Sequence, residues 1–208
     1  MWPWEHAIVG YLAYSLFCHT VYRDSPGGLE AFAVVFASVL PDLIDKPLAW
    51  EYGIFDSGYA LGHSIFFAVP LSLFVGIVAH SLGRPRTGLA FGLGYLLHLP
   101  SDVVDAYVRE GVYQPELMYW PVETTGSHGH SRNFLEQFFL LFSQYQSELL
   151  AGDLSTYMWI QIGMASGAAL LWLYDGAPVL REVLVGSFRF IRSLVSPENP
   201  TETSPERK

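Results

Sequence analysis

The sequence predicts an all-α, polytopic α-helical membrane protein with about five transmembrane helices. Hydrophobic residues make up 51% of the 208-residue chain and charged residues only 15%, well below the roughly 25% of a soluble globular domain. The apolar residues are gathered into runs that approach the length needed to cross a hydrocarbon core. The single cysteine, Cys18, excludes an internal disulfide and a cysteine zinc site.

Five apolar runs are the predicted spans, and they cover residues 4–22, 29–43, 61–82, 87–107 and 157–174. The first run has no basic segment before it and no small-residue cleavage site, so we interpret it as a retained anchor and not as a signal peptide. The second run is the shortest and ends at Pro41-Asp42-Leu43-Ile44-Asp45. Pro70 and Pro100 lie inside the third and fourth runs, where a membrane helix tolerates proline as a kink.

The connection over residues 108–156 is too long for a simple turn, which makes it a candidate cover for a site. Apolar and aromatic residues recur in it at helical spacing: Phe134, Phe138, Leu141, Phe142, Tyr145 and Leu149. This pattern predicts an amphipathic helix on the membrane surface or on the bundle. A second amphipathic segment covers residues 179–195. We therefore expect one helical membrane domain over residues 1–195 and a disordered acidic, polar tail over residues 196–208.

Basic residues are distributed unevenly between the two sets of connections. In a five-span arrangement Lys46, Arg109 and Arg132 lie on one side, and the other eight of the 11 basic residues lie on the opposite side. Basic residues are retained on the cytoplasmic side, so the N-terminus is predicted outside the plasma membrane and the C-terminus in the cytoplasm. The net charge of −9 argues against nucleic-acid binding. Membrane lipids are the expected partners, and the sequence identifies no protein partner.

Histidines and aspartates gather on the predicted outer side. The group consists of His6, Asp42, Asp45, His63, His98, Asp102 and Asp105, with His128 and His130 in the outer connection. His98 and Asp102 are one helical turn apart, so a helix through both places them on one face, where they can bind one metal ion. Carboxylates at membrane depth are costly unless they pair or bind an ion, and a divalent cation would neutralise this group.

Mixed ligation by His and Asp favours zinc, with manganese or iron as the other options, over calcium or magnesium. The predicted ligands of one or two such ions are His6, Asp45, His63, His98 and Asp102. Asp42 is the alternative to Asp45 as a ligand. We expect hydrolysis of a phosphoester, such as one in a phospholipid, by a metal-activated water, with Asp105 or Asp42 as the general base.

Two other functions fit the same group of residues. A metal or proton transporter would also place His and Asp at membrane depth, but its polar residues should continue through the membrane. The fifth predicted span offers only Gln161 as a strongly polar group near its middle, which argues against transport. The other alternative is a non-enzymatic membrane scaffold whose polar cluster is structural and which binds its partner through residues 179–195.

Four motifs in about the first 110 residues carry a family resemblance. They are Trp4-Glu5-His6-Ala7, Pro41-Asp42-Leu43-Ile44-Asp45, Gly62-His63-Ser64 and the Gly-Tyr-x-x-His-x-x-x-Asp segment Gly94–Asp102. They resemble the membrane-bound metal-dependent hydrolase family, also described as LexA-binding, inner-membrane-associated hydrolases (YdjM-like). The resemblance implies a metal-dependent hydrolase, and the acidic composition is similar to that of haloarchaeal members. The order of ligands is also similar to half of the zinc site of phospholipase C, but a second clear His-x-x-x-Asp is missing.

Overall fold

The computed structural model describes residues 1–124, 134–152 and 154–195, and this part of the chain is all-α, as the sequence predicts. Its α-helices are Pro3–Phe17 (α1), Gly28–Trp50 (α2), Ile65–Ser81 (α3), Pro85–Glu110 (α4), Phe134–Ala151 (α5), Thr156–Tyr174 (α6) and Leu180–Val195 (α7). A π-helical turn, Cys18–Tyr22 (η1), follows α1, and a 3-10 turn, Pro115–Met118 (η2), follows α4. The predicted tail, residues 196–208, lies outside the described residues, so the domain boundary stays a prediction.

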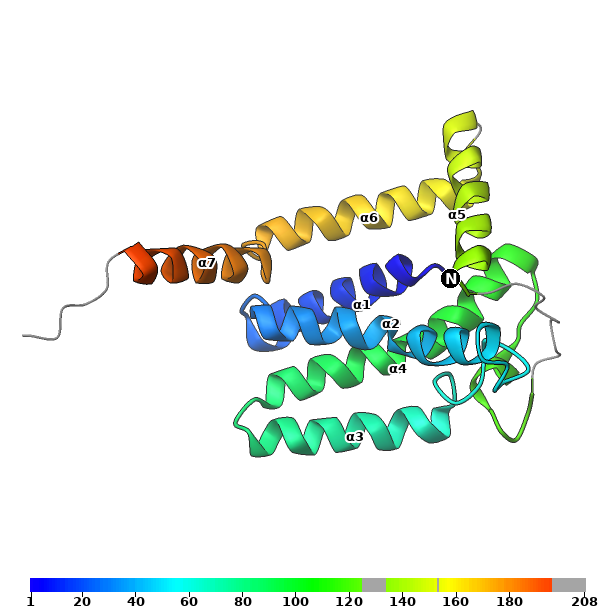
Figure 1. Cartoon of the computed structure of the whole chain (residues 1–208), viewed down its shortest axis with the longest axis horizontal. Coiled ribbons are helices and arrows are strands. Elements are labelled where there is room, and N and C mark those ends of the chain that lie inside the picture. The colour runs from blue at the N-terminus through cyan, green and yellow to red at the C-terminus, as the bar shows by residue number, and fades with distance from the viewer. Residues whose placement is uncertain (125–133, 153, 196–208) are drawn as a thin grey trace, which may run out of the picture.

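Helices α1 to α4 form the body of the molecule. α4 packs on both α2 and α3, while α1 packs against α2, α4 and α6. Figure 1 shows α1, α2, α3, α4 and α6 running alongside one another, with α5 crossing one end of the bundle and α7 extending away from the other. The N-terminus and the connection of residues 51–64 lie at the end that α5 crosses, which we call the α5 end.

Local chemistry sets the helix bounds. α1 and α4 begin at Pro3 and Pro85, whose fixed φ suits the first helical turn. α4 ends where Gly111 adopts a φ of 70°, a conformation that is accessible to glycine without steric cost. α2 continues through Pro41 to Trp50, so it is longer than the predicted run that ends at Leu43.

Close approach between helix backbones brings the polar side chains at the α5 end near one another. Gly94 of α4 lies so near α2 that a Cβ there would overlap the carbonyl oxygen of Val34. Gly10 of α1 leaves room for the side chain of Ser38 in the same way. The largest side chains buried around these contacts are Tyr14, Tyr95 and Leu99. Since the backbones of α1, α2 and α4 approach closely here, the polar residues one turn further along can meet.

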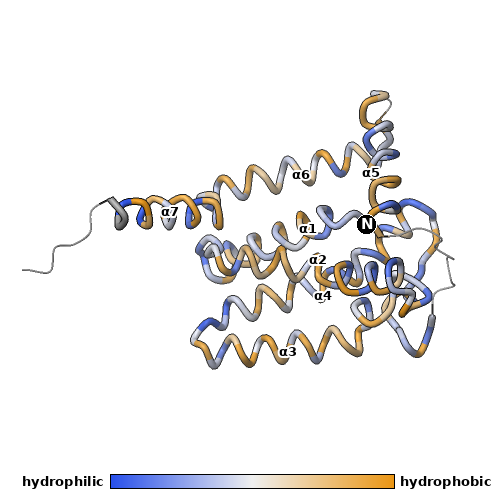
Figure 2. The backbone as a smooth tube through the Cα atoms, viewed as in Figure 1, coloured by the Kyte–Doolittle hydropathy of each residue, from blue (hydrophilic) through white to orange (hydrophobic). Residues whose placement is uncertain are grey.

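The five predicted spans correspond to α1 with η1, α2, α3, α4 and α6. In the described part of the chain, no helix is both long enough and apolar enough to cross a membrane. The third run forms a helix of 17 residues because it begins only at Ile65. In Figure 2, apolar positions follow α3 and α6, and hydrophilic positions lie toward the ends of the molecule. The helices therefore do not show the five spans that the sequence predicts.

Candidate metal centre

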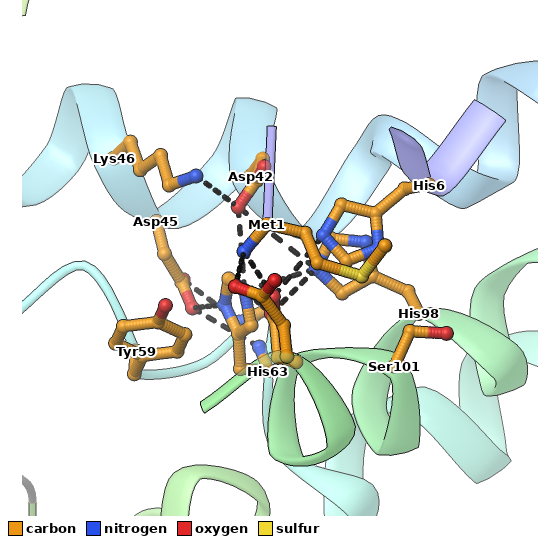
Figure 3. A network of polar contacts seen from close by, with 12 residues as sticks. Met1, His6, Asp42, Asp45, Lys46, Tyr59, His63, His98 and Ser101 are labelled. Atoms are coloured by element: carbon orange, nitrogen blue, oxygen red, sulfur yellow. Dashed lines mark hydrogen bonds and ion pairs between the residues drawn. The ribbon is translucent and has the colours of Figure 1, made fainter. Parts of the chain in front are cut away.

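Two histidines and two aspartates meet at the α5 end of the bundle. Asp42 comes from α2, His63 from the connection before α3, and His98 and Asp102 from α4. Nε2 of His63 lies 3.0 Å from Nε2 of His98, and Oδ2 of Asp102 lies 3.3 Å from both nitrogens. Oδ1 of Asp42 lies 3.4 Å from Nε2 of His63 and 3.9 Å from Nε2 of His98. Figure 3 shows this convergence, which draws on three separate segments.

In each of the two histidines, the hydrogen bond made by Nδ1 determines where the lone pair of Nε2 points. Nδ1 of His98 donates to the carbonyl oxygen of Ser38 at 2.6 Å, and Nδ1 of His63 donates to Oδ2 of Asp45 at 2.8 Å. Both partners are acceptors, so each neutral ring carries its proton on Nδ1. The Nε2 atoms of His63 and His98 therefore face each other and the carboxylates, an arrangement that favours a cation among them.

Asp45, predicted as a ligand, lies behind His63 and not among the converging atoms. Its carboxylate is fully buried and also accepts the backbone N–H groups of Ala60, Gly62 and His63 at 2.8 to 3.0 Å. These bonds hold the carboxylate against Nδ1 of His63 and fix the connection before α3. A carboxylate that orients a histidine in this way supports a metal ligand from outside the coordination sphere. Asp42, about one helical turn earlier on α2, is the aspartate of this pair whose oxygen has metal-ligand spacing to His63 and His98.

The converging atoms fit a metal ion by their spacing and by their lack of donors. Ligand atoms at about 2.0–2.1 Å from a tetrahedral zinc ion lie about 3.3–3.4 Å from one another, and most separations here are 3.0–3.4 Å. Both oxygens of Asp42 and Oδ2 of Asp102 are buried without a hydrogen-bond partner in the described residues. Buried polar atoms are normally paired, so this group of acceptors is typical of a cation site.

His6 of α1 completes a second potential ligand group. Its ring stacks on that of His98 with the centroids 3.6 Å apart, and its Nε2 lies 3.1 Å from Oδ1 of Asp102. The side chains of His6, His98 and Asp102 form one buried group with metal-ligand spacing, and those of Asp42, His63 and His98 form another. Asp102 directs Oδ1 toward His6 and Oδ2 toward His63, so it lies between the two groups.

Asp105, predicted as a general base, lies beside this centre without joining the converging atoms. Its Oδ1 accepts from the hydroxyl of Tyr157 at 2.7 Å, and its Oδ2 lies 3.0 Å from the amino group of Met1. The same amino group lies 3.0 Å from Oδ1 of Asp102. Tyr157 also donates to buried Glu5 at 2.8 Å, so α6 is tied to both α1 and α4. Asp105 is thus held close to Asp102 but remains separate from it.

Sequence reasoning did not assign Lys46 and Tyr59, which contact the centre, or Glu5, which accepts from Tyr157 beside it. Lys46 places Nζ 2.7 Å from Oδ1 of Asp42, and its position four residues after Asp42 on α2 was a signal for this pair. Tyr59 packs edge-on against His63 with ring centroids 4.8 Å apart. Burial and then the charge of Asp102 raise the pKa of Tyr59 well above its usual value, so its hydroxyl stays a donor. Glu5 directly precedes His6 but lacks any spacing signal.

A cavity of about 790 Å³ lies beside the centre. Its charged lining residues are Asp42, Lys46, Asp102, Asp105, Arg109, Glu110 and Glu116, together with the amino-terminal residue Met1. Its large apolar lining residues are Leu43, Trp50, Leu117, Phe134, Phe138 and Leu141. The cavity lining therefore combines charged and large apolar side chains. His128 and His130, which the sequence places on the outer side, lie outside the described residues.

A second polar group, which we call the Asp175 cluster, lies at the other end of α1. The buried carboxylate of Asp175 accepts the hydroxyls of Tyr11 at 2.6 Å and Ser15 at 2.7 Å. Nε2 of His19 lies 2.7 Å from its other oxygen. Every partner of this carboxylate is able to donate. The Asp175 cluster is therefore complete without an added ion.

Comparison with known proteins identifies the family. Neither a search of curated proteins nor a search of solved structures found a match. A sequence model described as YdjM inner membrane protein matches residues 1–185, which include α1 to α6 and every residue of the candidate centre. The match carries no information on a haloarchaeal source, which stays a prediction. Because the matched region covers most of the chain, the chain belongs to the YdjM inner membrane protein family.

Proposed function

We propose that this chain is a membrane-bound, metal-dependent hydrolase that cleaves a phosphoester. The observation that supports it most strongly is the 3.0 Å approach of two Nε2 atoms, from His63 and His98, beside buried carboxylates whose Oδ2 atoms, in Asp42 and Asp102, have no hydrogen-bond partner in the described residues. Asp102 directs Oδ1 toward His6 and Oδ2 toward His63, and two-metal sites are typical of enzymes that cleave phosphoesters. Lys46 and Arg109 in the adjacent cavity offer cations to an anionic substrate once bound metal ions neutralise the carboxylates that line the same cavity.

In this proposal, His6, Asp42, His63, His98 and Asp102 hold one or two divalent ions. Zinc is the preferred metal because neutral imidazole and carboxylate are its common ligands, with manganese or iron as alternatives. Such an ion supplies Lewis acidity and makes water nucleophilic near neutral pH. Asp45 and the carbonyl of Ser38 orient the two central histidines.

The remaining polar residues have distinct proposed roles. Asp105 is the proposed general base, since it lines the cavity and is held near the centre without belonging to the ligand groups. Tyr59, whose hydroxyl stays protonated, is available as a donor. In the membrane we place the centre on the outer face of the plasma membrane, with the N-terminus outside and the C-terminus in the cytoplasm, following the distribution of basic residues.

Metal analysis of the purified protein, followed by turnover assays, tests this proposal. We expect at least one zinc, manganese or iron per chain after mild purification, and loss of that metal in His98→Ala. The matched control is His19→Ala, which removes a histidine of the Asp175 cluster and should retain the metal. The loaded protein should hydrolyse p-nitrophenyl phosphate or bis(p-nitrophenyl) phosphate. Metal content that is unchanged in His98→Ala, or bound metal without turnover of any phosphoester, would contradict the proposal.

A further inference from the structure

We propose that the substrate of this centre is a lipid phosphoester, whose phosphate lies beside Lys46 and whose hydrocarbon chain lies along the α5 side of the cavity. This inference rests on the proposed hydrolase function and adds the substrate class to it. A molecule with a negative head group and a long apolar part fits this cavity of about 790 Å³, because the lining combines the cations Lys46 and Arg109 with large apolar side chains. Lys46 on α2 and the apolar residues of α5 are the two parts of the lining that carry the inference.

Lys46 marks the position of the head group. Its side chain is largely buried, with 17% exposed, yet it lines the cavity, and its ammonium lies 2.7 Å from Oδ1 of Asp42. A cation next to a proposed metal ligand weakens metal binding unless it also neutralises negative charge on a bound molecule. A phosphate between the metal and Lys46 fulfils this condition. Arg109, half-exposed on the last turn of α4, adds a second cation at the rim.

α5 contributes three of the large apolar residues that line the cavity. Phe134, Phe138 and Leu141 recur at helical spacing, so all three line the cavity from one face of the helix. The first residue of α5 is fixed at α2, because Glu51 accepts the backbone N–H of Phe134 at 3.1 Å and Trp50 stacks on its ring. Phe138 packs on Trp2 with ring centroids 6.3 Å apart. The apolar residues of α5 therefore have a defined position in the lining of the cavity.

The orientation of α5 fits entry of the chain from a membrane. α5 crosses the end of the bundle, whereas the bundle helices run alongside one another (Figure 1). Leu135 and Phe139 on its other face are exposed by 62% and 63%. A helix with apolar residues on a surface-exposed face is typical of segments that lie in the membrane interface. The same helix thus presents apolar residues both to the cavity and to the surroundings.

Two neighbouring leucines on α5 provide a matched pair for the test. Leu140 and Leu141 are 36% and 37% exposed, but only Leu141 lines the cavity. We would titrate the zinc-loaded protein in nanodiscs with methyl-, butyl-, hexyl- and octylphosphonate by calorimetry, and subtract the signal of empty nanodiscs. Each methylene that becomes buried should strengthen binding about fourfold. Leu141→Ser should weaken octylphosphonate binding about tenfold and leave methylphosphonate unchanged. Leu140→Ser should behave as wild type.

Two further variants make the outcome independent of a single substitution. Leu43→Ser, on the α2 side of the same cavity, should reduce the chain-length effect even if Leu141→Ser folds poorly. Lys46→Gln should weaken all phosphonates by a similar factor of about tenfold, with an unchanged gain per methylene. Equal chain-length dependence in wild type, Leu141→Ser and Leu43→Ser would overturn the lipid assignment alone. Methylphosphonate binding that is the same in zinc-loaded and chelator-treated protein would instead contradict the metal-centre proposal.

Discussion

Polar clusters of similar composition lie at the two ends of α1. They differ in the number of hydrogen-bond donors relative to acceptors. In the Asp175 cluster, one buried carboxylate is surrounded by a tyrosine, a serine and a histidine that can all donate to it. In the candidate metal centre, histidine nitrogens and carboxylate oxygens face one another as acceptors. The comparison shows that buried His and Asp alone do not indicate a function. The number of donors relative to acceptors distinguishes a structural cluster from a cation site.

The largest expected difference between the clusters is in metal content. Asp102 lies within 3.1–3.3 Å of the Nε2 atoms of all three histidines, so Asp102→Ala should lower bound zinc at least about tenfold. His6→Ala leaves the group of Asp42, His63 and His98 intact and should lose only part of the metal. Asp175→Ala, the matched change in the other cluster, should keep the wild-type stoichiometry. Mass spectrometry of the metal content in purified variants measures all three, and equal loss in Asp102→Ala and Asp175→Ala would contradict the assignment.

A smaller effect is expected from the residue behind His63. Asp45→Asn should weaken zinc affinity by about 10- to 100-fold while the stoichiometry at saturating zinc is unchanged, because Asp45 orients His63 and does not itself converge on the centre. Competition with a chelator of known affinity gives the dissociation constant. Loss of zinc at saturation would show that Asp45 is a direct ligand. Asp175→Asn serves as the control and should leave the affinity unchanged.

Much of this arrangement could be predicted from the sequence. The helical bounds of α1, α4 and α6 follow their apolar runs closely, and the i, i+4 spacing indicated that His98 and Asp102 share a face. Apolar runs identify helices well because burial depends on residue type. Whether such a helix also spans a membrane depends on continuous apolar length, and the described helices do not provide it.

The division of roles between Asp42 and Asp45 could not be predicted. Both follow Pro41 on α2, and their difference depends on the connection before α3, whose backbone N–H groups surround Asp45 alone. Those contacts join residues 15 to 18 positions apart, a distance over which helical periodicity gives no information. Glu5 and Tyr59 were missed for the same reason, since each gains its importance from packing between distant segments.

Thermal stability in the absence of metal should respond differently in the two clusters. At pH 8, zinc-free Asp102→Asn should lose less stability than Asp175→Asn, because an amide N–H₂ facing His63 and His98 supplies a donor to two acceptors and offsets the lost ion pair with the amino group of Met1. Asp175→Asn should lose about 1–3 kcal/mol, because its amide group faces donors. Thermal unfolding in the same detergent measures both. A loss of stability in zinc-free Asp102→Asn as large as that in Asp175→Asn would show that its acceptors are already satisfied.

The smallest expected effect is the acid sensitivity of the Asp175 cluster. Burial alone raises the pKa of Asp175, but hydrogen bonds from Tyr11, Ser15 and His19 lower it below its usual value. A carboxylate whose pKa is depressed in the folded state stabilises the protein above its unfolded pKa of about 3.9 and loses that contribution as the pH falls through the folded value. The difference in melting temperature between wild type and Asp175→Asn should therefore be constant from pH 7 to about pH 5 and shrink below about pH 4. A difference that stayed constant down to about pH 3 would contradict a stabilising role for the ionised Asp175 carboxylate.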